Sequence, residues 1–243
     1  MNELLQKIYE LNLSQTFYNL SGQVALSVYL IFSIFHRKKY DLSLLKTVIL
    51  VLTTHFTAVY AMNSFAKIEE ALLSESGRYL PKAYIYIPLI VFAISKLLKI
   101  PFGKAIDFIA PGIMLQKTIV TLGCIFTGCC DGYPFPIGIW DPYSQRIQFP
   151  VQYLESILCF VIACFLLYYE KKRGYPGDGK AYGWMLVLFG TVWLSMDLMK
   201  NNTKLFFEIS SLGFHSLFMM FEGTAWLLTL EEIKIQKYNK KFS

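Results

Sequence analysis

Seven apolar stretches, each about long enough to cross a lipid bilayer, constrain this chain more than any other feature. A helix needs ~17–25 mainly apolar residues to cross ~30 Å of hydrocarbon at ~1.5 Å per residue. The stretches are residues 20–35, 42–62, 83–98, 104–126, 150–169, 182–199 and 212–230. With 55% hydrophobic and 16% charged residues, the chain is too apolar for an ordinary soluble domain. The sequence therefore predicts an all-α integral membrane protein with about seven transmembrane helices.

Lys and Arg residues between the stretches predict the orientation. Connections rich in these residues stay on the cytoplasmic side of a membrane. The ends near residues 37–39, 96–104, 171–180 and 234–241 hold fourteen Lys and Arg, and the alternate ends hold seven. We therefore expect the N-terminus outside and the C-terminus in the cytoplasm.

The segment before the first stretch, residues 1–19, alternates apolar and polar residues. Its apolar positions recur at roughly helical spacing: Leu4, Leu5, Ile8, Leu11 and Leu13. This pattern predicts either an amphipathic helix on the membrane surface or an arm packed against the bundle. The segment lacks the features of a cleavable signal peptide, and no repeat or change of composition divides the chain. We expect a single transmembrane domain over residues 1–243.

Several ionisable side chains fall inside the predicted spans, where each costs about 2.5–3.5 kcal/mol on insertion scales. They are Lys46, His55, Asp107, Lys117, Glu155, Asp197, His215 and Glu222. Lys46, Asp107 and Asp197 are close enough to helix ends to reach the membrane interface, or they face a cavity. Lys117, Glu155 and Glu222 lie deeper. A cavity that holds Lys117 against Glu155 or Glu222 would suit a phosphate headgroup, and internal pairing without a ligand is the alternative.

The fifth stretch places two polar side chains on one helical face. Gln152 and Glu155 are three residues apart and follow Pro150, which suits the first turn of a helix. We expect this face to point inward. The net charge of +6 is spread over clusters at helix ends, so it predicts contact with anionic lipid and no nucleic-acid partner.

The five cysteines lack the paired spacing of a zinc site, so we expect no metal and no cofactor. Cys159 and Cys164 lie within an apolar span and are predicted to pack in the core. Cys129 and Cys130 fall at the outer end of the fourth span, where they pair, form a covalent intermediate or fill space.

Three motifs follow one another between Ile100 and Ser156. Residues 100–112 read IPFGKAIDFIAPG, residues 123–132 read GCIFTGCCDG, and residues 150–156 read PVQYLES. In kind and order these motifs resemble those of the prolipoprotein diacylglyceryl transferase family of bacterial membrane enzymes. A weaker similarity covers Tyr182 to Lys200, and the resemblance also implies the seven-span topology.

The resemblance implies transfer of a diacylglyceryl group from phosphatidylglycerol to a prolipoprotein cysteine, with no metal or nucleotide, in the bacterial cytoplasmic (plasma) membrane. The chain departs from the family at positions that bear on activity. The family's arginines fall on Thr121, Trp193 and Lys200, its histidine falls on Phe149, and its glutamate falls on Asp197. Lys117 lies four residues before Thr121 on the same helical face and is the candidate to supply the lost charge.

The candidate catalytic residues are therefore Glu155, Gln152 and Lys117. The candidate substrate-binding residues are Thr121, Gly123, Cys129, Cys130, Arg146, Asp197 and Lys200. The expected partners are the membrane, phosphatidylglycerol or another phospholipid, and a prolipoprotein signal peptide. The missing arginines favour a second hypothesis, an inactive accessory protein that binds phospholipid. A small transporter ranks last, because paired broken helices in two corresponding halves are absent from the sequence.

Overall fold

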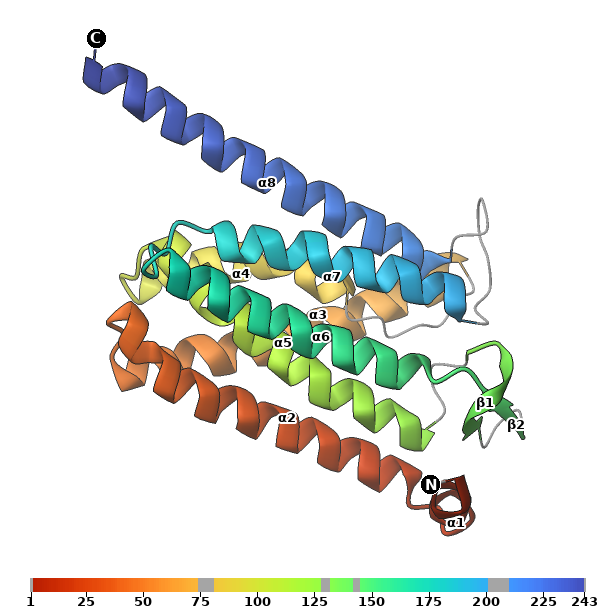
Figure 1. The fold of residues 1–243 in the computed structure, drawn as a ribbon. Helices are drawn as coiled ribbons and strands as arrows, with labels where there is room; N and C mark the ends of the chain where they lie inside the picture. Colours follow the sequence, from red (N-terminus) through yellow and green to blue (C-terminus); the bar gives the residue numbers. More distant parts are fainter. Residues whose placement is uncertain (1, 74–80, 128–131, 142–144, 201–209, 243) are drawn as a thin grey trace.

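The computed structural model describes residues 2–73, 81–127, 132–141, 145–200 and 210–242. Its elements are α1 (Asn2–Glu10), α2 (Ser14–His36), η1 (Arg37–Tyr40), α3 (Leu44–Leu73), α4 (Pro81–Leu97), α5 (Phe102–Thr127), β1 (Pro134–Asp141), β2 (Arg146–Gln148), α6 (Val151–Lys172), α7 (Lys180–Met199) and α8 (Ser211–Phe242). Each predicted span corresponds to one helix, with most ends within two residues. The long helices run along one bundle axis, with the N-terminus and the strands at one end and the C-terminus at the other (Figure 1).

The chain is an all-α integral membrane protein. Within the described residues, α2 with η1, the first part of α3, and α5, α6 and α7 are long and apolar enough to cross a bilayer. The apolar part of α4 is shorter, and α8 carries charges at Glu222, Glu231, Glu232 and Lys234. The count of seven spans and the outward N-terminus stay predictions.

Helix α5 is the central helix of the bundle. It packs against α2, α4, α6 and α7, and its residues from Ala105 to Met114 are all buried. A helix that is apolar on every side needs neighbours on every side, and α5 has them. Most of the first motif and the start of the second lie in α5, so these parts of the resemblance occupy the core.

Two glycines of those motifs let α2 approach α5 closely. A Cβ atom on Gly112 would overlap the Tyr29 ring, and a Cβ on Gly123 would overlap the Ser21 hydroxyl. The two glycines are three helical turns apart, so they share one face of α5. Small residues at such positions allow helix backbones to pack closely within a membrane.

Gly112→Ala is expected to lower the apparent Tm in detergent, because the added methyl group would overlap the Tyr29 ring and force α5 and α2 apart. Gly22→Ala on α2 is the matched control, since a Cβ there meets nothing within 4 Å. That control should be neutral or slightly stabilising, because alanine favours a helix over glycine by about 1 kcal/mol. Equal Tm values for both variants would contradict the packing described here.

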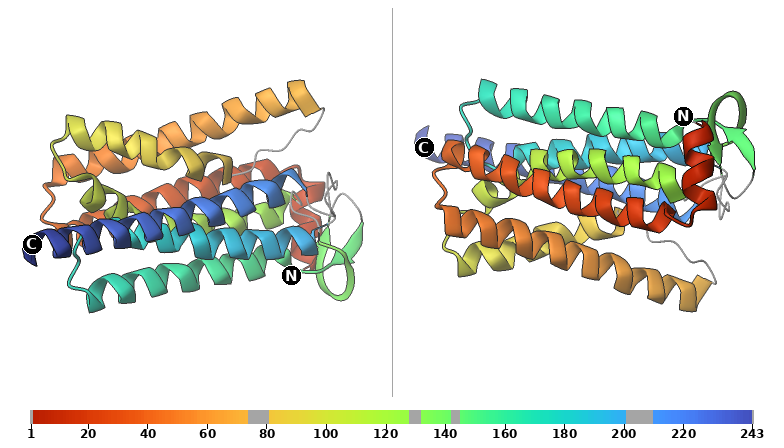
Figure 2. Two further views of the ribbon diagram at one scale, coloured as in Figure 1. Left: turned by 90° about the horizontal axis from the view of Figure 1, so that it is seen from above. Right: turned by 90° about the horizontal axis from the view of Figure 1, so that it is seen from below.

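Helix α1 lies across the end of the bundle, and the chain after α5 forms a hairpin beside it (Figure 2). Leu5 is buried against Ile125 of α5 and Ile139 of β1, and Ile8 is buried too, whereas Leu4 is 61% exposed. One apolar side of α1 therefore packs on the protein. Its contact with the membrane surface stays a prediction. The hairpin was not predicted, because its Pro and Gly residues indicated only a loop.

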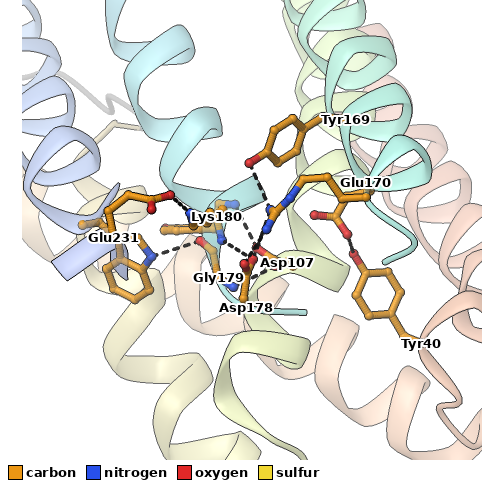
Figure 3. Close-up of polar contacts among 11 residues, drawn as sticks. Tyr40, Asp107, Tyr169, Glu170, Asp178, Gly179, Lys180 and Glu231 are labelled. Atoms are coloured by element: carbon orange, nitrogen blue, oxygen red, sulfur yellow. Dashed lines mark hydrogen bonds and ion pairs between the residues drawn. The ribbon is translucent and has the colours of Figure 1, made fainter. Parts of the chain in front are cut away.

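The opposite end of the bundle holds a polar network, which includes Asp107 (Figure 3). Asp107 is fully buried, and its two carboxylate oxygens accept the backbone N–H groups of Gly179 at 2.8 Å and Tyr182 at 3.1 Å. It therefore caps the first turn of α7 from α5, and of the two alternatives given for it, the buried one is observed. Tyr40 donates a hydrogen bond to Glu170 in the same network.

The connection between α6 and α7 is fastened by further contacts of this network. Arg173 pairs with Asp178 at 2.6 Å, Lys180 pairs with Glu231 of α8, and the Trp226 indole donates to the carbonyl of Gly179 at 3.0 Å. Partial burial works to raise the pKa of the Asp178 carboxyl, but the hydrogen bonds from Arg173 outweigh it and hold that pKa below its ordinary value. The network joins α5, α6, α7 and α8 at this end.

Candidate functional site

Glu155 lies at the centre of the candidate site, on the second turn of α6. The helix begins at Val151, directly after Pro150, so Gln152 and Glu155 occupy the same face near its start. Both are buried, as that spacing predicted, and Glu155 is only 1% exposed. The carboxylate therefore needs partners within the protein.

Four side chains from α5 and α7 donate to this carboxylate. Lys117 Nζ lies 2.6 Å from Oε1 of Glu155, and the Thr121 hydroxyl, one turn further along α5, lies 3.4 Å from the same oxygen. The Trp193 indole donates to Oε1 at 2.8 Å, and Lys200 Nζ lies 3.3 Å from Oε2. We name Lys117, Thr121, Glu155, Trp193 and Lys200 the Glu155 cluster.

The Glu155 cluster satisfies the requirements for keeping charges inside a protein. Isolated ions lose several kcal/mol of hydration on burial, which is recovered only when opposite charges and hydrogen-bond donors surround them. Lys117 also lies 4.8 Å from the centroid of the Trp193 ring, within the range of a cation–π contact. Two ammonium groups with one carboxylate make a site that is suited to an anionic ligand.

The cluster lies at the same end of the bundle as the hairpin. Lys200 forms an antiparallel bridge with Gly132, and the backbone N–H of Tyr133 donates to the carbonyl of Met199 at 3.3 Å. Phe149, just before α6, in turn donates from its N–H to the carbonyl of Tyr133 at 2.9 Å. The backbone beside the hairpin thus fastens the end of α7 to the start of α6.

The structure brings together four of the residues selected from the sequence: Lys117, Thr121, Glu155 and Lys200. Of the two acidic partners considered for Lys117, it is Glu155 that forms the pair. Gln152 lies one turn before Glu155 and lines a small hollow under the hairpin. The other walls of this hollow are Ile125, Ile139, Trp140, Asp141, Gln148 and Phe149.

Three other selected residues lie in different surroundings. Arg146 is exposed on β2, opposite Asp141 of β1. Gly123 faces Ser21 of α2. Asp197 is fully buried and accepts hydrogen bonds from the backbone N–H and the hydroxyl of Ser210, which precedes α8.

The cysteines follow the predictions only in part. Cys159 is buried in the core as predicted, whereas Cys164 is exposed, so its prediction as a core residue is wrong. Helix α6 turns this side chain away from the neighbouring helices. Cys129 and Cys130 lie outside the described residues. Within the described ranges, no three His, Cys, Asp or Glu side chains gather closely enough to hold a metal ion.

Trp193 is the member of the Glu155 cluster that was not selected from the sequence. It was noted only as the residue in place of a family arginine. A signal existed, because a buried tryptophan usually finds an acceptor for its N–H, and a carboxylate lies in the neighbouring span. The sequence could not show that α6 and α7 lie close enough for Trp193 to reach Glu155.

Comparison with known proteins covers the part of the chain that contains the cluster. The prolipoprotein diacylglyceryl transferase family matches residues 81–229, which is more than half of the 243 residues. The chain belongs to the prolipoprotein diacylglyceryl transferase family. All five residues of the Glu155 cluster fall inside the matched range, so the cluster lies in the family's own part of the fold.

Two curated relatives are similar at low identity. The phosphatidylglycerol–prolipoprotein diacylglyceryl transferase of Clostridium tetani (strain Massachusetts / E88) is 27% identical over 108 residues, which cover 42% of this chain and 43% of the relative. The phosphatidylglycerol–prolipoprotein diacylglyceryl transferase 2 of Clostridium perfringens (strain 13 / Type A) is 25% identical over 139 residues, covering 54% and 53%. The matches thus span about half the length of the relatives. The names of both describe a transferase of lipoprotein biosynthesis.

Proposed function

We propose that this chain transfers the diacylglyceryl group of phosphatidylglycerol to the cysteine thiol of a prolipoprotein. The observation that carries the proposal is the Glu155 cluster, where two lysines and a carboxylate meet inside the region that matches the family. The end of the bundle that holds the cluster is the one predicted to face outward. The proposed location is the outer face of the bacterial cytoplasmic membrane, and the signal peptide of the acceptor is a proposed partner.

The proposed reaction needs only groups of the kinds that the cluster holds. The acceptor sulfur forms a C–S bond to the glyceryl carbon, while the bond from that carbon to the phosphate oxygen breaks. Glycerol phosphate leaves, and the proton of the thiol passes to a base and then to the products. Lys117 and Lys200 are the proposed cations for the leaving phosphate, and Glu155 is the proposed base or orienting carboxylate.

In this proposal, lysine replaces arginine as the cation that binds the phosphate. Arginine grips phosphate through two parallel hydrogen bonds, whereas lysine acts as a compact point charge. The family has an arginine at the position of Thr121. Lys117 lies one helical turn before Thr121 and pairs with the Glu155 carboxylate. The charge is thereby retained at a shifted position along α5.

Lys117→Met is expected to reduce diacylglyceryl transfer about 100-fold or more, because removal of one donor to developing charge commonly costs that much. The variant should still fold, since Glu155 keeps Lys200, Trp193 and Thr121 as partners. Lys104→Met is the matched control at the other end of the bundle, where Lys104 lies 3.9 Å from the exposed Asp41. Unchanged transfer in Lys117→Met, measured by mass spectrometry of a reporter lipoprotein, would remove Lys117 from the mechanism.

The proposed function itself is tested by complementation. A bacterial strain depleted of its own diacylglyceryl transferase receives this chain, and the reporter lipoprotein is analysed for the thioether product. The product at levels that restore growth supports the proposal. Its complete absence, with the protein present in the membrane, would contradict it.

An inactive accessory protein that binds phospholipid is the second candidate. One observation favours it, since Glu155 Oε1 is shared by three donors, and none of the five described cluster residues is an arginine. Phosphatidylglycerol that copurifies with the protein, without thioether product in the complementation strain, would decide for this candidate.

A further inference from the structure

Trp193 contacts two of the three ionic groups that the proposed function uses, Lys117 and Glu155. Its indole N–H donates to Glu155 Oε1 at 2.8 Å, the oxygen that Lys117 Nζ approaches to 2.6 Å, and its ring lies 4.8 Å from that same ammonium group. The three side chains come from α5, α6 and α7, and they form a closed triangle. Trp193 is only 4% exposed, so this arrangement is held inside the protein.

We infer that Trp193 is a positioning residue, which holds the Lys117 ammonium and the Glu155 carboxylate in one fixed geometry. The inference rests on the proposed function and adds a residue to its machinery. Without the indole N–H, Oε1 loses a directional bond and Glu155 gains freedom to rotate. Without the ring, Lys117 also loses the π face beside it.

The ring of Trp193 is itself fixed by an aromatic chain that leads away from the cluster. Phe189, one turn earlier on α7, packs on Trp193 with ring centroids 4.8 Å apart, and Tyr84 of α4 meets Phe189 edge to face at 5.2 Å. The Tyr182 hydroxyl donates to the backbone carbonyl of Tyr84 at 2.8 Å, which ties α4 to α7. Trp193 therefore packs on the aromatic contact between α4 and α7 on one side and meets the cluster on the other.

A phenylalanine would fill most of the same space, so packing alone does not require tryptophan here. The indole N–H is the feature that phenylalanine lacks, and it is directed at the buried carboxylate. Removal of a hydrogen bond to a charged group typically costs about tenfold or more in the quantity that depends on it. This difference between the two side chains makes the inference testable.

The kinetic test compares Trp193→Phe and Trp193→Leu with Trp226→Phe. Trp226 also donates its N–H, to a backbone carbonyl at the opposite end of the bundle, so its variant undergoes the same chemical change. We expect Trp193→Phe to lower kcat about tenfold or more with KM for phosphatidylglycerol within about twofold. Trp193→Leu should lower kcat and also raise KM, because the ring beside Lys117 is lost. Trp226→Phe should stay near the wild type.

Two kinetic results would overturn the inference. One is a Trp193→Phe enzyme with wild-type kcat. The other is an equal loss in Trp193→Phe and Trp226→Phe, because that would indicate a general effect of losing an indole. In both cases the wild type still makes thioether product, so the proposed function is unaffected. Loss of the product in the wild type itself would instead refute the proposed function.

A spectroscopic test does not depend on turnover or on the folding of a Trp193 variant. Trp140, Trp184 and Trp226 are replaced by phenylalanine, and the emission of Trp193 is recorded in phosphatidylcholine bilayers with and without phosphatidylglycerol. We expect the emission to change with phosphatidylglycerol, because a phosphate bound at the Lys117 ammonium alters the electric field at the ring that this ammonium contacts. Adding Lys117→Met should abolish the change. Emission that is indifferent to phosphatidylglycerol, in a protein that still makes thioether product, would also overturn the inference.

Discussion

Glu155→Gln is expected to abolish diacylglyceryl transfer and to lower the free energy of unfolding by about 3–5 kcal/mol. The substitution keeps the shape of the side chain but removes the negative charge that pairs with Lys117 and Lys200. Breaking a buried ion pair from one side is costly because the remaining charge stays buried without that partner. Apparent Tm values in detergent at a fixed scan rate, with thioether analysis, measure the two effects.

A double variant separates the two effects of this substitution. Glu155→Gln combined with Lys117→Met removes one charge of each sign, so we expect part of the lost stability to return while transfer stays absent. Glu231→Gln is the single-site control, because Glu231 also pairs with a lysine but its side chain is 51% exposed. Exposed pairs contribute only about 0–1 kcal/mol. A Glu155→Gln variant as stable as Glu231→Gln would argue against a buried ion pair.

Asp107→Ala is expected to produce the second large effect, a loss of stability of about 3 kcal/mol or more. The change leaves the buried N–H groups of Gly179 and Tyr182 without their acceptor and removes a negative charge from the positive end of α7. Asp107→Asn should fall between the wild type and Asp107→Ala, because an amide retains one oxygen acceptor. The apparent Tm of the three proteins gives this order.

Asp41→Asn serves as the control for the Asp107 series. Asp41 lies at the same end of the bundle, but its side chain is 91% exposed, and asparagine tolerates the left-handed backbone of this position, so the Tm should stay nearly unchanged. Asp107 lies at the opposite end of the bundle from the Glu155 cluster, so well-folded Asp107→Asn protein should keep most of its specific activity. A wild-type Tm in Asp107→Ala would show that α7 does not need this cap.

The helices and most of the Glu155 cluster were predictable because each signal lies within a short stretch of sequence. An apolar run of sufficient length can satisfy its backbone in a bilayer only as a helix or within a closed barrel, so the spans were recognisable one by one. Lys117 and Glu155 were conspicuous because unpaired charges are costly in apolar spans. Gly112 and Gly123 belonged to recognised motifs, but their contact with α2 was not anticipated.

Other features depended on which helices become neighbours. Asp107 caps α7 only because the start of α7 packs against α5, and the two partners are more than seventy residues apart in the sequence. The exposure of Cys164 depends on which side of α6 the other helices leave uncovered. The hairpin required two short strands to pair around a turn, and their Pro and Gly content hid the alternation that marks a strand.

The sequence by itself determined the bilayer as solvent, the approximate spans, the family motifs and the charged residues that need partners. Those properties follow from local composition and spacing, since the cost of a polar group in hydrocarbon depends on the residue itself. Only the tertiary structure decided that Lys117 pairs with Glu155 and that the Trp193 indole shares the same oxygen. Hydrogen bonds act over about 3 Å, so their partners are set by how α5, α6 and α7 pack together.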